Sequence, residues 1–355
     1  MTQQAPVWLD RQQPNALNCF RLIFATAVLF DHNWTLGGFG HNPLSDLFSP
    51  IGGLGAAAVD GFFSISGFLI MGSWLSRRNA ESFLRARVVR IWPAFAVAFI
   101  ISALIAALGS GHQWLQYIRS IPGPSWLVGI FTLNQTELNR ALSFAHNPYP
   151  TVVNGSMWTI QIEFICYLVV ALVGSIGGFR RRWLVIIFTS FSICLAASED
   201  RILPAAWMHW PRFASFFGAG ALFYLFHMRI PKNGWLALGC VASLLTGRYF
   251  SHFFTMPIAG TYIILYAAYT APDWIKRIGA KNDISYGLYL YAFPVQQFIF
   301  SQIGGSEWFN NPWFSFAIAF MCCLGFGWLS WLFVEKPSKA FMKASINRHC
   351  WHPNA

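Results

Sequence analysis

The sequence alternates long apolar stretches with short polar ones along almost its whole length. A run of about 17 to 25 mainly apolar residues is long enough to cross the hydrocarbon core of a bilayer as a helix. Such runs occupy residues 17–36, 52–72, 91–109, 156–176, 183–198, 212–228, 234–249, 256–271, 284–303 and 312–333. The pattern predicts an all-α polytopic membrane protein with about ten transmembrane helices, a number that the two short runs at 183–198 and 234–249 leave open.

A further apolar run, residues 126–133, is too short to cross a bilayer and begins beside two prolines. We expect it to form a re-entrant or interfacial segment inside one outer excursion that covers residues 110–155. A full crossing there would reverse the side of every later loop.

Composition supports the membrane class. With 55% hydrophobic and 10% charged residues, the chain is too apolar for a soluble domain of 355 residues. In a soluble chain the net charge of +11 would suggest nucleic acid, but here Lys and Arg lie in short loops. Such loops indicate orientation in a bilayer, and we expect no nucleic-acid binding. The seven cysteines show no CxxC or His-paired spacing, so neither disulfides nor a metal site are expected.

The loop charges also predict the topology. If the N-terminus is cytoplasmic, 18 of the 24 Lys and Arg residues fall in inner loops or the inner tails. The outer loops then hold only Arg119, Arg140, Arg201 and Arg248. Cytoplasmic loops are enriched in cations, so both termini are expected in the cytoplasm.

The first apolar run contains two ionisable groups, Arg21 and His32. Eleven positions are close to three helical turns, so both side chains lie on one face, about 16 Å apart. An arginine inside lipid is unfavourable by about 2.5 to 3.5 kcal/mol and usually faces a bundle interior or a polar cavity. A helix-end arginine at the headgroups with an interfacial histidine explains the same pattern, and this run alone leaves both open.

Two carboxylates lie at similar depth in other predicted spans. Asp60 lies about eight residues in from the outer end of its span, where a lone carboxylate needs a partner, and His32 in the preceding antiparallel helix is the nearest candidate. Glu163 either joins these two groups, pairs with a buried arginine or bonds to Tyr167. The Gly and Ser residues around Asp60 are typical of closely packed helices.

The loop after the second span is rich in arginine. The enrichment of cations in cytoplasmic loops explains the charge of this loop. It does not require Arg87 and Arg90 to lie three positions apart on one helical face. With Arg21 they could hold a phosphorylated cytosolic ligand, because a guanidinium fork matches phosphate oxygens. Later, Tyr286 and Tyr289 share a face for which aromatic packing is the default interpretation.

Six motifs carry a family resemblance: Arg21 and His32 with ten residues between them, DGFFSISGFLI from Asp60, RVVRIWP from Arg87, WTIQIEF from Trp158, ISYGLYLY from Ile284 and FVEKP from Phe333. With these motifs the sequence resembles the acyltransferase 3 superfamily of bacterial inner-membrane O-acyltransferases over essentially the whole chain. The first two motifs are the most specific of the six.

The resemblance implies one transmembrane acyltransferase-like domain over residues 1–345 and a cytoplasmic tail over residues 346–355, in the cell inner membrane. It implies an acyl group, most often acetyl, moved from acyl-CoA as co-substrate to a hydroxyl of a surface glycan or lipid-linked oligosaccharide. No permanently bound cofactor is implied. The essential roles would fall on Arg21 and His32, and donor binding on Arg87 and Arg90.

On this interpretation His32 is the general base, Asp60 orients it and Glu163 completes the catalytic group; acylation of His32 itself stays open. Tyr291 and Ala292 stand where many relatives have a second histidine. Some relatives carry a fused extracytoplasmic domain; here we expect transfer to finish within the membrane domain or on a separate partner. The alternative is a transporter whose ionisable groups line a proton or substrate pathway. The missing inverted repeats argue against it.

Overall fold

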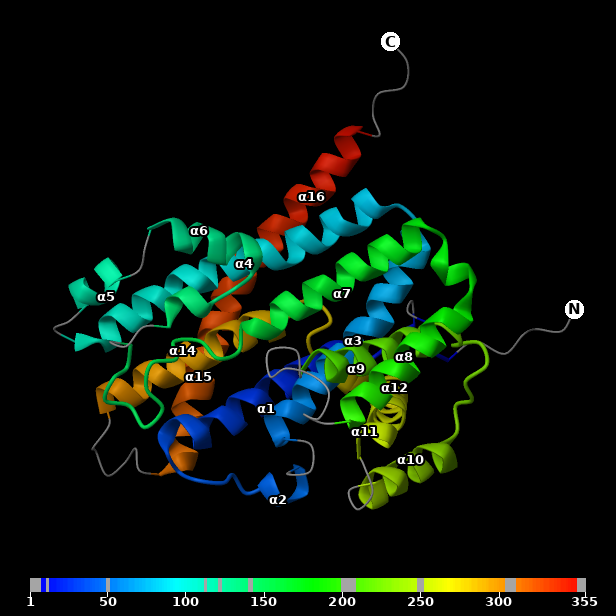
Figure 1. Ribbon diagram of the computed structural model, residues 1–355, viewed down its shortest axis with the longest axis horizontal. Coiled ribbons are helices and arrows are strands. Elements are labelled where there is room, and N and C mark those ends of the chain that lie inside the picture. The colour runs from blue at the N-terminus through cyan, green and yellow to red at the C-terminus, as the bar shows by residue number, and fades with distance from the viewer. Residues whose placement is uncertain are drawn as a thin grey trace, which may run out of the picture. The chain divides into compact units, whose positions relative to one another are not determined.

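The computed structural model describes residues 8–10, 13–48, 52–111, 114–120, 123–139, 143–198, 209–247, 252–303 and 311–349. In these residues every regular element is a helix, which confirms the all-α prediction (Figure 1). The long helices are α1 (Leu17–Gly37), α3 (Leu54–Arg77), α4 (Ala80–Gly109), α7 (Trp158–Ser175), α8 (Arg182–Ala197), α9 (His209–Leu225), α10 (Gly234–Gly247), α14 (Ser285–Ile303), α15 (Pro312–Ser330) and α16 (Lys336–His349). The shorter elements are α2 (Ser45–Phe48), α5 (Trp114–Ser120), α6 (Gly123–Thr132), η3 (Thr136–Leu138), η4 (Gly178–Arg180), α11 (His252–Thr255), η7 (Met256–Gly260), α12 (Thr261–Thr270), α13 (Asp273–Arg277) and η9 (Trp331–Glu335).

Each predicted span coincides with helix in the described chain. Five helical stretches there are long and apolar enough to cross a membrane: Leu54–Arg77, Ala80–Gly109, Trp158–Ser175, Phe253–Thr270 and Pro312–Met342. Helices α1 and α14 have 21 and 19 residues, but their polar side chains lower their hydropathy, and α8 and α10 are shorter. The number of ten spans, the side of the termini and the re-entrant role of α6 stay predictions.

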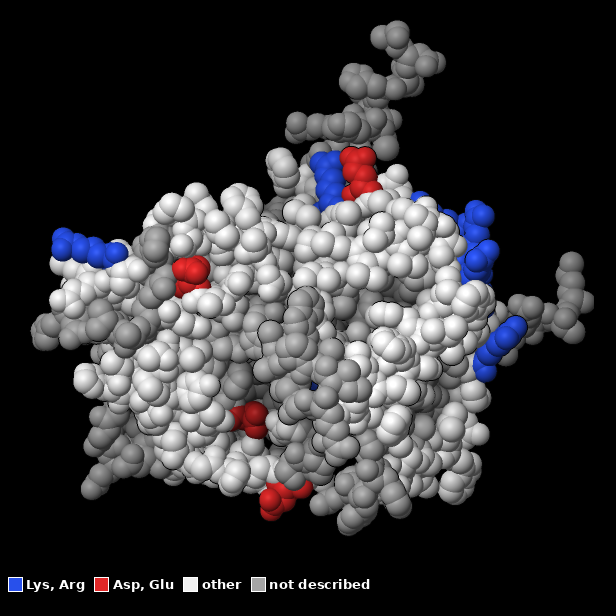
Figure 2. Space-filling model, viewed as in Figure 1, with Lys and Arg blue, Asp and Glu red and all other residues white. Residues whose placement is uncertain are grey.

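Large apolar side chains cover the outside of several helices. Phe191 of α8 is 64% exposed and Trp235 of α10 is 81% exposed. Figure 2 shows a face on which charged residues are few. Apolar surface of this extent is unfavourable in water and suits contact with lipid, as expected of a membrane protein.

The chain divides into two compact units. The first comprises Met1–Phe24, Asp46–Leu84 and Ile165–Lys281, and the second comprises Ala25–Ser45, Arg85–Phe164 and Asn282–Ala355. Each unit consists of three separate stretches of the chain. Helices α1, α4 and α7 each contribute residues to both units. The predicted domain boundaries, 1–345 and 346–355, stay predictions.

In the first unit, α3 packs directly along α9. A Cβ atom added to Gly67 would collide with the carbonyl oxygen of Phe217, and one added to Gly220 would collide with that of Ser64. Only glycine allows the two backbones to approach this closely. The predicted packing role is therefore confirmed for Gly67.

In the second unit, the segment before α7 is attached to α14 by side-chain hydrogen bonds. The Gln297 amide donates to the carbonyl oxygens of Tyr149 and Val152 at 2.7 and 2.8 Å. Pro294 cannot donate a backbone bond to the Leu290 carbonyl one turn earlier. That oxygen accepts instead from Asn154 Nδ2 at 2.9 Å, so the proline inside α14 creates the site that anchors the segment.

Candidate active site

His32 lies in the second unit, on α1. Its ring meets Phe293 of α14 nearly edge to face, with 5.2 Å between ring centroids. The Nδ1 atom is buried and has no hydrogen-bond partner among the described residues. One turn earlier, the Leu29 carbonyl accepts from Gln296 Nε2 at 2.8 Å, which fixes α1 against α14 beside the histidine. His32 is thus rigidly placed while one ring nitrogen stays available.

Ser156 lies next to the same phenylalanine. A Cβ added to the neighbouring Gly155 would lie 2.5 Å from the Phe293 ring, so the backbone is in direct contact with it. The Ser156 backbone N–H donates to Asn154 Oδ1 at 3.1 Å. Its carbonyl accepts from the Tyr289 hydroxyl at 3.0 Å and from the Thr159 hydroxyl at 3.1 Å. The main chain is held on both sides, yet the buried Ser156 hydroxyl has no partner in the described chain.

Glu163 belongs to the same unit and lies one turn after Thr159 in α7. The Thr159 and Tyr289 hydroxyls are 2.7 Å apart. The Glu163 carboxylate lies near the Tyr289 hydroxyl. Since Phe293 follows Tyr289 by one turn, α14 links Glu163 to the surroundings of His32. The tyrosine predicted to serve packing alone also makes polar contacts here.

Asp60 is in the first unit, on α3, and its carboxylate is bound by Arg212 of α9. The guanidinium donates from Nε to Oδ1 at 2.9 Å and from Nη2 to Oδ2 at 2.7 Å. Asp60 is 2% exposed. This corrects the predicted pairing with His32: the glycine contacts bring α9 so close to α3 that Arg212, at the start of α9, reaches both oxygens.

The arginines predicted to bind the donor fall in both units. Arg21 belongs to the first unit, and Arg87 and Arg90 of α4 belong to the second. Arg90 Nη2 forms an ion pair with Asp283 Oδ2 at 3.1 Å, and its side chain is 29% exposed. Asp283 also accepts from Ser285 at the start of α14. The convergence of the three arginines stays a prediction.

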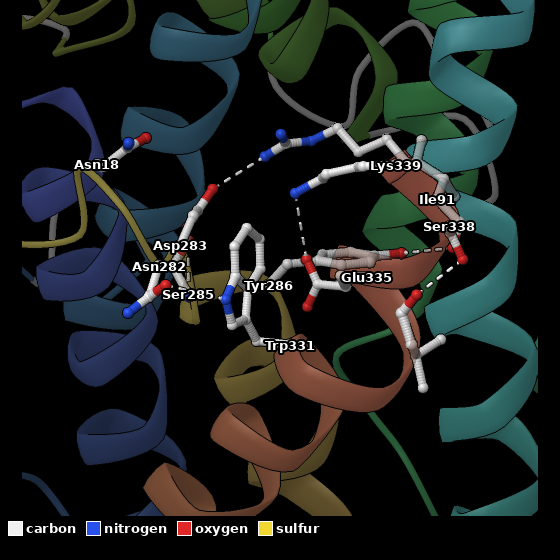
Figure 3. A network of polar contacts seen from close by, with 12 residues as sticks. Asn18, Ile91, Asn282, Asp283, Ser285, Tyr286, Trp331, Glu335, Ser338 and Lys339 are labelled. Atoms are coloured by element: carbon white, nitrogen blue, oxygen red, sulfur yellow. Dashed lines mark hydrogen bonds and ion pairs between the residues drawn. The ribbon is translucent and has the colours of Figure 1, made fainter. Parts of the chain in front are cut away.

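Close to this ion pair lies a second one, shown in Figure 3. Lys339 Nζ is 3.9 Å from Glu335 Oε2 and lies 4.2 Å from the centre of the Trp331 ring. The indole N–H donates to Asn282 at 3.2 Å. Glu335 ends the wider π-helical turn η9 that precedes Pro337, a residue with no N–H for a regular turn. The motif at the end of the apolar region thus builds a polar network at the start of α14.

The structure therefore brings His32 and Glu163 into one unit, where they lie near Phe293 and Tyr289, one turn apart in α14. Asp60 has Arg212 as its partner. Four contributors were not predicted as site residues: Ser156, Arg212, Asp283 and Gln296. Gln296 is a polar position inside an apolar run, and such positions usually face a bundle interior. The others depend on contacts between distant segments, which no local pattern contains.

Comparison with known proteins identifies the class. A family model described as an acyltransferase domain matches residues 15–332. The chain therefore belongs to this acyltransferase family and is an acyltransferase, which decides against the transporter alternative.

Two relatives match over nearly their whole length. An "O-acetyl transferase" of Shigella phage Sf6 is 28% identical over 333 residues, which cover 90% of this chain and 95% of the relative. "Nodulation protein 10" of Rhizobium leguminosarum bv. viciae is 25% identical over 380 residues, covering 94% of this chain and 95% of the relative. No solved structure matches the chain.

Proposed function

We propose that the protein transfers an acetyl group from acetyl-CoA to a hydroxyl of a cell-surface or exported glycan, in the cell inner membrane. The observation that carries this proposal is the near-complete alignment with the relative named O-acetyl transferase, within a family whose model covers residues 15–332. The acceptor class rests on the family resemblance, and the donor on the arginines of α4.

His32 acts as general base. A neutral imidazole takes a proton efficiently near neutral pH. The acceptor hydroxyl gives its proton to His32, its oxygen attacks the thioester carbonyl carbon, and the carbon–sulfur bond breaks. The proton then goes to the departing CoA thiolate, so an ester and free CoA result. Nδ1 has no hydrogen-bond partner among the described residues, and the ring packs against Phe293; both observations support this role.

Glu163 assists from one turn away along α14, by stabilising positive charge that develops during proton transfer. Its proximity to Tyr289, one turn before Phe293 in α14, supports this placement. For Asp60 we propose a positioning role: it holds Arg212 of α9 in place, since both carboxylate oxygens accept from that guanidinium.

Arg87 and Arg90 bind the phosphates of the donor from the cytosolic side, while the glycan arrives from the opposite side. The exposed part of the Arg90 side chain supports contact with a dissolved ligand. Arginine binds phosphate with paired hydrogen bonds.

The test uses the purified full chain in detergent and in proteoliposomes that contain the host's glycolipids. Thioester cleavage of acetyl-CoA is followed by release of free thiol, and the glycan is analysed by mass spectrometry for added acetyl. We expect both signals together. A protein that leaves acetyl-CoA intact in the presence of these glycolipids contradicts the proposal.

A further inference from the structure

Three buried hydrogen-bonding atoms around Phe293 lack a partner within the described residues: His32 Nδ1, Ser156 Oγ and Gln296 Oε1. Ser156 is 1% exposed and Gln296 is fully buried. A buried polar atom without a partner is unfavourable by about 1 to 3 kcal/mol, so native proteins rarely leave one. Three in one neighbourhood point to a ligand that supplies the missing bonds. We call these residues the Phe293 polar cluster.

Contacts with Phe293 and along α14 hold the cluster together. The ring of Phe293 touches both His32 and the backbone of Gly155, the residue before Ser156. Gln296 follows Phe293 by three positions, so it lies one turn further along the same face of α14. It also binds the Leu29 carbonyl, one turn before the histidine in α1.

The chemistry of the atoms defines what they can bind. The Leu29 carbonyl can only accept, so the Gln296 NH₂ must face it, and Oε1 must be the atom without a partner. An amide oxygen requires a donor. A histidine nitrogen that acts as base requires one as well, and the Ser156 hydroxyl can both donate and accept. A ligand that pairs with all three atoms must therefore carry at least two hydrogen-bond donors.

A thioester carbonyl cannot meet this demand, because it carries no hydrogen to donate and would repel the Gln296 oxygen. A sugar meets it with neighbouring hydroxyls. The Ser156 hydroxyl has no partner within the described residues, while hydrogen bonds hold the Ser156 backbone on both sides. A binding site requires such a group, because its position is fixed before the ligand arrives.

We propose that Ser156 and Gln296 form, with His32, the subsite for the glycan acceptor. One sugar hydroxyl donates to His32 Nδ1 and reacts, while a second hydroxyl of the same sugar donates to Gln296 Oε1. Ser156 bonds to the sugar and fixes its orientation. This inference rests on the proposed function, and it adds that the acceptor presents at least two hydroxyls.

The test compares Ser156→Ala and Gln296→Met with the matched controls Ser175→Ala and Gln302→Met. The Ser175 hydroxyl bonds within its own helix, and Gln302 is exposed near the end of α14. Membrane vesicles from the expressing strain receive acetyl-CoA labelled in the acetyl group, and label in the surface glycan is measured over a range of acetyl-CoA concentrations. Ser156→Ala removes no hydrogen bond of the described structure, so it should fold normally.

Loss of one hydrogen bond to the acceptor should lower the transfer rate about tenfold. The apparent KM for acetyl-CoA should stay unchanged in both variants, and the controls should match the wild type. Wild-type rates in the Ser156→Ala variant would overturn the subsite and leave water as the partner of these atoms. A raised donor KM would overturn it too, since the atoms would then bind CoA. Failure of wild-type vesicles to label any glycan would instead refute the proposed function.

Discussion

The ion pair between Asp60 and Arg212 offers a sharp test of the first unit. Asp60 is 2% exposed and the Arg212 side chain 16%, and the carboxylate receives hydrogen bonds at 2.9 and 2.7 Å. Asp60→Ala would leave a buried guanidinium without its counter-charge. Removal of one partner of a buried pair destabilises a protein by about 3 to 5 kcal/mol. An unfolding entropy of about 2.1 cal/mol/K per residue gives about 0.75 kcal/mol/K for 355 residues, so the Tm should fall by about 4 to 7 °C.

The double variant Asp60→Leu with Arg212→Met separates stability from chemistry. Replacing both charges with apolar groups of similar volume is often neutral or stabilising, so its Tm should return to within about 2 °C of the wild type or exceed it. Melting is followed by size-exclusion chromatography of the detergent-solubilised protein after heating. If Asp60→Ala alone melts at the wild-type temperature, the ion pair does not hold α3 and α9 together and the reasoning fails.

The remaining predictions concern the donor site and the helix contact. Arg87→Ala and Arg90→Ala should each raise the apparent KM for acetyl-CoA about tenfold with little change in kcat, because a grip on remote phosphates contributes uniform binding. The exposed Arg85, changed to Ala in the same helix, should leave KM unchanged. Gly220→Ala should lower the Tm by several degrees because its Cβ would meet backbone of α3, whereas Gly239→Ala, with open space around it, should leave the Tm equal or higher.

Two outcomes would contradict these predictions. If the apparent KM for acetyl-CoA is unchanged in both arginine variants, Arg87 and Arg90 do not bind the donor, and their charges only orient the protein in the membrane. Equal melting of the two glycine variants would mean that α3 and α9 are not in the close contact described.

The sequence predicts the helices well because their signal is local. Apolar runs of spanning length determine where each helix lies, and the glycines of α3 predict close packing. The partner of Asp60 was beyond prediction, since Arg212 follows it by 152 positions. Local patterns also do not reveal that Ser156 is held through its backbone and lacks a partner for its hydroxyl. Such facts arise only when α7 and α14 are packed together.

The candidate site likewise combines residues that the local sequence predicts with contacts that only the packed structure reveals. His32 is predicted from its position inside an apolar run, because a polar group there must face protein or a cavity. The orientation of its ring depends on Phe293, which no pattern in the first helix contains. Gln296 is visible as a polar residue in an apolar run, but only the bond to Leu29 shows which of its atoms stays available.

The central claim is that His32 is the base for transfer of an acetyl group, and one measurement tests it directly. Acetyl-CoA labelled in the acetyl group is added to membrane vesicles that contain wild-type protein, His32→Ala or the control His41→Ala, at matched expression and melting temperature. His41 is exposed and lies outside the site. We predict label in the glycan for the wild type and His41→Ala, and a loss of at least about a hundredfold for His32→Ala. Glycan labelling by folded His32→Ala at a rate near that of the wild type would contradict the account.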